Sequence, residues 1–176
     1  MIPITTMLRT AAVVALAGTG LMGCSGFKAH QESFTCPATT TVPDLQTLAD
    51  VGSNGNQDTV RSAGRISNIA AVCDSETAGI KADLSIEFSA LRTTPAVRHL
   101  DLPYFVAIAD STGNILGKQE FSVGVDFPGE ATVAKTTDKI TAHLPLKNVQ
   151  LGNVYTVIVG FQLTQNELNF NRAHEQ

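Results

Sequence analysis

Histidine and cysteine side chains are the groups in this sequence best suited to chemistry, and His99 has the most suggestive neighbours. The run Val-Arg-His-Leu-Asp-Leu-Pro places Arg98 directly before it and Asp101 two residues after it, in a predicted loop. A histidine beside a carboxylate can act as a general base, but a catalytic dyad also needs a nucleophile. The sequence contains no GxSxG or HExxH pattern that would supply one. We therefore expect His99 to be a solvated loop histidine.

The other histidines form no ligand pattern. His30 and His174 lie near the two ends of the chain, and His143 falls on the polar parity of a predicted strand. The glycine-rich run 52–55 lacks the Lys-Ser/Thr pair of a phosphate-binding loop. We expect neither a cofactor nor a bound metal.

The first 24 residues have the order of an export signal. Residues 1–23 carry one charged side chain, Arg9, followed by an apolar stretch at 11–17 and then by small residues. This stretch is shorter than the roughly 20 residues that a membrane-spanning helix needs. The sequence Leu21-Met22-Gly23-Cys24 resembles the lipobox of bacterial lipoproteins. The resemblance implies cleavage before Cys24 and lipidation of that cysteine.

The lipobox resemblance also implies a location. In the sorting rule of enteric bacteria, Asp after the lipidated cysteine retains a lipoprotein in the inner membrane, whereas this chain has Ser25. We therefore expect Cys24 to anchor the protein in the outer membrane, facing the periplasm, and disfavour the inner membrane. Several acyl chains on one residue hold a protein firmly in its leaflet. In layout the chain is similar to small outer-membrane lipoproteins of Gram-negative bacteria that carry an immunoglobulin-like or fibronectin III-like domain.

Two cysteines remain once Cys24 carries lipid. In an oxidising periplasm Cys36 and Cys73 most simply form a disulfide. Closing this loop is expected to stabilise the fold by about 3–4 kcal/mol. Two separate buried thiols are the alternative, and a metal pair is disfavoured because no CxxC motif is present.

Composition excludes two classes of function. The chain has 12 basic and 16 acidic residues, so loss of Arg9 with the signal leaves 11 against 16 and a net charge of −5. A mildly acidic chain without a Lys/Arg run is not expected to bind nucleic acid. All three methionines, Met1, Met7 and Met22, lie in the signal, so the processed chain has no thioether ligand for copper(I).

The sequence pattern of the remaining chain predicts mainly β-strands. Apolar and polar residues alternate at 80–90, 121–127 and 140–146, while 104–109 and 154–163 are apolar on both parities. Between residues 65 and 73 the apolar phase slips, which predicts a bulge or a strand that switches sheets. The turn-rich run 110–114 predicts a β-hairpin. Near Tyr155, the run 151–157 resembles the corner before the sixth strand of fibronectin III domains.

We therefore predict an all-β, immunoglobulin-like antiparallel β-sandwich of about seven strands. A short helix is predicted at 43–49, and the capping-box spacing that begins at Thr164 predicts a second through Phe170. The expected division is a signal peptide, a flexible tether, the sandwich domain and a frayed tail, at residues 1–23, 24–41, 42–172 and 173–176 respectively.

Three functions follow in order of preference. The first is a non-catalytic interaction or assembly module of the cell envelope, held at the membrane through Cys24 and bound to an envelope protein. The second is a carrier of a small apolar ligand or lipid in a cavity between the sheets. The third is an enzyme that uses His99. The cavity of the second hypothesis is expected to be formed by Phe88, Phe105, Phe121, Phe127 and Phe161.

Overall fold

The computed structural model describes residues 34–51, 60–146 and 149–174, which belong to one compact unit. The predicted signal, the lipobox with Cys24, His30 and the glycine-rich run 52–55 lie outside the described residues. None of the helices in the described ranges has the length and apolar character needed to cross a membrane.

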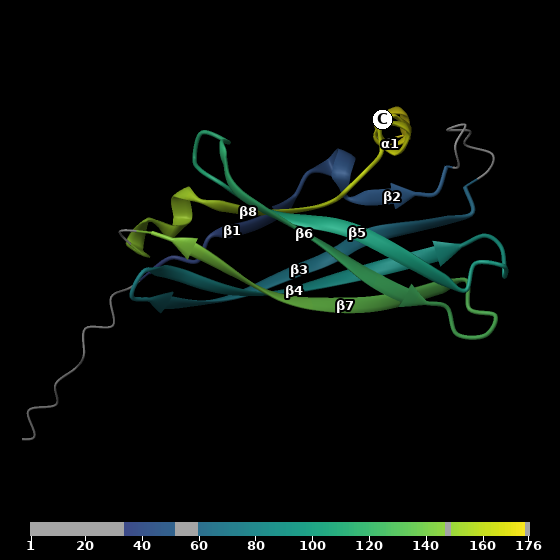
Figure 1. The fold of residues 1–176 in the computed structure, drawn as a ribbon, viewed down its shortest axis with the longest axis horizontal. Coiled ribbons are helices and arrows are strands. Elements are labelled where there is room, and N and C mark those ends of the chain that lie inside the picture. Colours follow the sequence, from purple (N-terminus) through teal and green to yellow (C-terminus); the bar gives the residue numbers. More distant parts are fainter. Residues whose placement is uncertain (1–33, 52–59, 147–148, 175–176) are drawn as a thin grey trace, which may run out of the picture. The chain divides into compact units, whose positions relative to one another are not determined.

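Two four-stranded sheets make up the described part of the domain, one layered on the other (Figure 1). The prediction of an all-β sandwich is confirmed, with eight strands in the described residues instead of about seven. Every strand pair is antiparallel except that of β1 and β8, which is parallel. The first sheet runs in the order β1 (Ala38–Thr41), β8 (Thr156–Phe161), β5 (His99–Ala109), β6 (Ile115–Asp126), and the second in the order β2 (Thr47–Ala49), β3 (Ser62–Glu76), β4 (Gly79–Arg92), β7 (Val133–Pro145).

The connectivity is that of an immunoglobulin-like sandwich. A β3–β4 hairpin in one sheet is followed by a β5–β6 hairpin in the other, and β7 and β8 then return beside β4 and β5. By these pairings β3, β4 and β7 match strands A, B and E of the immunoglobulin fold. In the other sheet, β5 and β8 match strands C and F. The edge position beside strand F, which G occupies in that fold, is taken here by β1 in parallel orientation.

The irregularity predicted in β3 is a β-bulge. The pairing of β3 with β4 shifts register between Ile66 and Asn68. Ile66 is fully buried before the bulge, and Ile69 packs against the core after it. The extra residue, Ser67, points outward and donates its hydroxyl to a Glu87 carboxylate oxygen at 2.8 Å. One inserted residue thus keeps the apolar side chains on the inner face.

Aromatic rings fill the centre of the core. Tyr104 and Phe88 are fully buried, with ring centroids 5.0 Å apart, and Phe161 lies 6.0 Å from Phe88. Phe105 lies on the other face of its strand, where the Lys118 ammonium sits 4.7 Å from its ring centroid. The phenylalanines named in the carrier hypothesis therefore do not surround a common space.

Arg92, at the end of β4, is a buried cation that sequence reasoning missed. Only 3% of it is exposed, and its guanidinium lies 5.1 Å from the centroid of the Phe127 ring. It donates to the carbonyl oxygens of Val97, Gly129 and Ala131 at 2.7, 2.6 and 2.8 Å. Arg92 therefore ties the β4–β5 connection to the β6–β7 connection.

The first predicted helix is largely wrong. Pro43–Leu45 form a single turn of 3-10 helix, η1, and Thr47–Ala49 are strand β2. Pairing with residues 63–65 of β3 overrides the local helical pattern. The folded domain also begins earlier than expected, because Ala38–Thr41, within the predicted tether, pair with β8.

The second predicted helix is confirmed and is longer than expected. It is α1 (Gln165–His174), which follows the 3-10 helix η3 (Val149–Val154) and strand β8. The Thr164 backbone N–H and hydroxyl both donate to a Glu167 carboxylate oxygen, at 2.7 and 2.8 Å. Part of the predicted frayed tail is helical because Asn171, 4% exposed, donates from its amide to the carbonyl oxygens of Asp44 and Thr47 at 2.8 and 2.7 Å.

A disulfide joins Cys36 to Cys73, with their Cα atoms 5.7 Å apart. Cys36 lies just before β1 of one sheet and Cys73 lies in β3 of the other. Beside the disulfide, Phe34 is partly buried and packs against the core. We call residues 34–41 the strap, because they close this side of the sandwich as an extended segment.

Candidate functional site

The two sheets leave an apolar groove between their end strands β6 and β7. Its volume is about 380 Å³ and it is open to solvent. Inward-facing side chains of β5, β6 and β7 supply its apolar lining, namely Val106, Ile108, Phe121, Ile140 and Ala142.

The groove exists because β6 lacks large inward side chains in its first half. The second half of β6 turns Phe121, Val123 and Val125 toward the core, whereas the equivalent positions before them are Gly117 and Gln119. These two residues pair with Ile108 and Val106 of β5, whose side chains line the groove. A Cβ atom placed on Gly117 would meet no atom within 4 Å, so the space beside it is open.

A second hollow continues the groove toward η3. It has a volume of about 190 Å³ and shares Ile108, Gly117 and His143 with the first. Leu116, which also lines this hollow, is 59% exposed. The remaining lining comes from Leu144, Pro145, Leu146 and Tyr155. The two hollows together form an elongated apolar trough that follows the strands.

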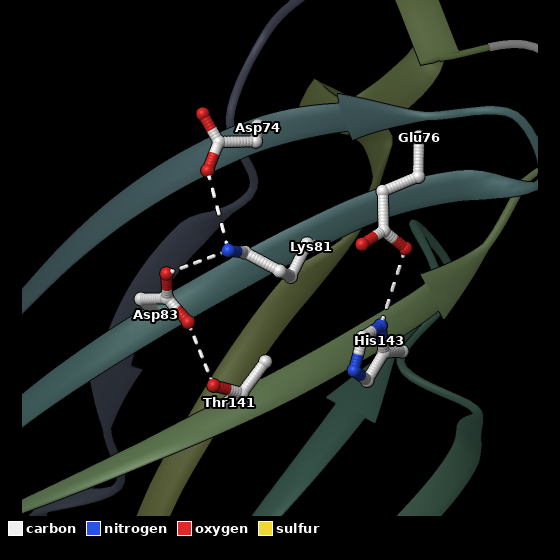
Figure 2. Close-up of polar contacts among 6 residues, drawn as sticks. All are labelled: Asp74, Glu76, Lys81, Asp83, Thr141 and His143. Carbon is white, nitrogen blue, oxygen red and sulfur yellow. Dashed lines mark hydrogen bonds and ion pairs between the residues drawn. The ribbon is translucent and has the colours of Figure 1, made fainter.

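Polar contacts cover the outer face of the neighbouring sheet, as Figure 2 shows. The Lys81 ammonium on β4 lies 3.0 Å from an Asp83 carboxylate oxygen and 3.5 Å from one of Asp74. The Thr141 hydroxyl donates to Asp83 at 2.7 Å. This hydrogen bond and the one from Lys81 lower the pKa of Asp83, and the bond to Asp83 raises the pKa of Lys81.

His143 lies on β7 at the rim of the groove. It is exposed, as its polar parity predicted, and its Nδ1 lies 3.3 Å from a Glu76 carboxylate oxygen (Figure 2). The described residues include no group of three or more histidine, cysteine or acidic side chains arranged to hold a metal ion. The outer face is therefore a solvated ladder of ion pairs and hydrogen bonds at the rim of an apolar trough.

His99 lies in strand β5 and not in the predicted loop, because it pairs with Asp126 of β6. Its Nδ1 is 2.6 Å from Asp126 and its Nε2 is 3.1 Å from Asp101. The imidazole lies over Gly124, where a Cβ atom would come within 2.6 Å of the ring. The hydrogen bond to Asp126, followed by that to Asp101, raises the pKa of His99. Carboxylates therefore occupy both ring nitrogens, the positions that a nucleophile or a substrate would need.

Among the described strands, β6 and β7 are the sheet edges that border the groove, and they differ in how well they are protected from pairing with another chain. Strand β7 carries Lys135 and Lys139, and its Asp138 points inward and accepts the Tyr104 hydroxyl at 2.7 Å. Burial, followed by this hydrogen bond, raises the pKa of Tyr104. Lysines and inward charges are the features that keep edge strands from pairing with other chains. In its exposed first half β6 has Lys118 and Glu120, which form an ion pair at 3.0 Å, but no charged side chain that points inward, so it is the less protected edge.

Comparisons with known proteins give no match to a family model, a curated protein or a solved structure. The site is therefore defined by geometry alone. Of the residues singled out from the sequence, Cys36 and Cys73 are joined at the β1 end of the sheets, and Cys24 lies outside the described residues. Sequence reasoning missed the groove, although the loss of apolar alternation at Gly117 and Gln119 was the available signal.

Proposed function

We propose that this chain is a lipoprotein of the outer membrane, anchored through Cys24 with its domain facing the periplasm, and that it acts as a non-catalytic interaction or assembly module of the cell envelope. The observation that carries the role is the apolar trough beside β6, the less protected of the two edges. Contiguous apolar surface on a folded domain is typical of protein-binding sites. The lipobox pattern supports the anchor and the compartment.

The surroundings of His99 support a non-catalytic role. Both ring nitrogens have carboxylate partners, and the ring is 48% exposed. Binding through a strand edge and a groove needs no acid–base pair. Replacement of His99 by Gln is therefore expected to leave the cellular role intact, and loss of that role would support the enzyme hypothesis instead.

In-cell crosslinking of the natively lipidated protein, followed by mass spectrometry, tests the interaction role. We expect one envelope protein to be captured reproducibly. The Cys24→Ala variant serves as the control, because it should leave the membrane fraction and lose this capture. Equal capture by the two forms, or no envelope protein at all, would contradict the proposal.

A carrier of an apolar ligand is the second candidate, and the trough also supports it. A volume of about 380 Å³ with apolar walls lies within the range of small-molecule sites, roughly 300–1,000 Å³. Native mass spectrometry of the protein purified without detergent tests this role. A stoichiometric lipid would support the carrier, and protein that emerges free of lipid would remove it.

A further inference from the structure

We propose that β6 accepts an extended segment of an envelope protein as an added strand, whose alternate apolar side chains enter the groove beneath it. This inference rests on the proposed interaction role and specifies the surface and the chemistry of the partner. The partner segment is uncharged in the groove and has large apolar residues at every second position.

The backbone edge of β6 is the first reason. β6 is the last strand of its sheet, and its first six residues are exposed. A strand in this position presents unpaired N–H and C=O groups that can form a ladder with another chain. The other free edge, β7, carries Lys135, Lys139 and the inward Asp138, which disfavour such pairing.

The shape of the groove is the second reason. Successive side chains of an added strand point to opposite faces, so every second one would lie between the sheets. At that level Gly117 and Gln119 place no apolar side chain beside Val106 and Ile108, which line the groove. The missing side-chain volume of β6 is therefore available to apolar side chains of the partner.

The strap is the third reason, because it adds a short strand to the other end of the same sheet. Its residues Ala38–Thr41 pair with β8, and its Phe34 packs against the core. Pairing of an additional short strand with an end of this sheet is thus an arrangement that the fold already uses, here through the backbone, because none of the side chains of Ala38–Thr41 is buried. A hydrocarbon chain would fill the groove but would leave the edge of β6 unpaired, which favours a polypeptide as the occupant.

The test uses the full-length lipidated protein in cells, with a photo-crosslinking residue in place of Lys118 or of Glu120. Both positions lie on the outer face of β6 and are two residues apart. In an added strand, the residues that lie beside them are therefore also two apart. We expect both crosslinks to fall on one segment of one envelope protein, on residues separated by two. A Gly117→Leu substitution in each background fills the groove and should remove at least nine-tenths of both crosslinks.

Ser122→Leu is the matched control, since it adds the same side chain to the outer face of the same strand, away from the groove. It should leave the crosslinks unchanged. Crosslinks that resist Gly117→Leu, or that fall only on lipid or on a second copy of this chain, would overturn the inference. The in-cell crosslinking described above can also be done with the Gly117→Leu variant. If that variant still captures the envelope partner although both photo-crosslinks behave otherwise than expected, the interaction role stands and only the assignment to β6 fails.

Discussion

Arg92 stabilises the domain through backbone carbonyl oxygens, and no carboxylate among the described residues pairs with it. Its guanidinium satisfies carbonyl oxygens from two connections that are more than thirty residues apart in sequence. Replacement by Met keeps much of the apolar stem but leaves these carbonyls without a donor, and we expect a loss of about 3 kcal/mol in the free energy of unfolding. Urea denaturation measures it.

Arg92→Lys separates the role of charge from that of geometry. Lysine keeps the positive charge but lacks the planar fork that reaches several carbonyls at once. We therefore expect it to recover less than half of the stability lost in Arg92→Met. Full recovery would mean that charge alone matters at this position.

The His99 pair makes stability depend on pH. Hydrogen bonds to Asp126 and Asp101 raise the pKa of His99, so the folded state favours the charged imidazole. The stabilisation from the charged His99 is fully present below the pKa of His99 in the unfolded chain, about 6.5. It is lost as the pH rises through the higher pKa of His99 in the folded protein. The melting temperature of His99→Asn should therefore fall below that of the unsubstituted protein at pH 5.5 and converge with it at alkaline pH. A constant difference across this range would refute the assignment.

The groove exists because Gly117 and Gln119 of β6 place no apolar side chain between the sheets. Gly117 does not adopt a positive φ, and a Cβ atom there would meet open space, so a larger residue fits without strain. Gly117→Leu should cover apolar surface and raise the free energy of unfolding by about 1 kcal/mol. Thermal denaturation measures this change. A destabilised variant would show that the groove cannot take an apolar side chain.

Most elements could be predicted from the sequence, because alternation in strands such as β4 reports directly which face is buried. The bulge in β3 was visible as a phase slip, and α1 as a capping box at Thr164. The segment 43–49 was not predictable from local pattern, because pairing with β3 decides its conformation. Arg92 was hidden for a similar reason, since backbone carbonyls in loops carry no residue-type signal.

The two open sides of the sandwich are closed to different extents. At the β1 end the Cys36–Cys73 disulfide fixes the strap to the other sheet, and this pairing could be predicted by counting cysteines. At the β6–β7 side no segment of the described chain covers the groove. The contrast between the two sides could not be predicted from the sequence, because it depends on which strands end each sheet.

Reduction of the disulfide should weaken the fold without changing its architecture. The loop between Cys36 and Cys73 spans 37 residues, for which chain entropy gives about 3–4 kcal/mol. The double variant Cys36→Ser/Cys73→Ser should therefore unfold like the reduced protein and well before the oxidised one. Denaturant titration with and without a reductant measures the difference, and coincident oxidised and reduced curves would contradict this role.

The β6–β7 side is tested most directly by amide hydrogen exchange of the full chain in the membrane fraction, where the proposed Cys24 anchor would hold it, compared with the purified domain. We predict that those amides of residues 115–121 in β6 that do not donate to β5 exchange quickly in the isolated domain and are protected at least tenfold in the membrane. The amides of β2, at the far end of the other sheet, should exchange equally in both. Identical exchange along β6, or protection confined to another strand, would contradict the claim that the β6–β7 side is the functional surface.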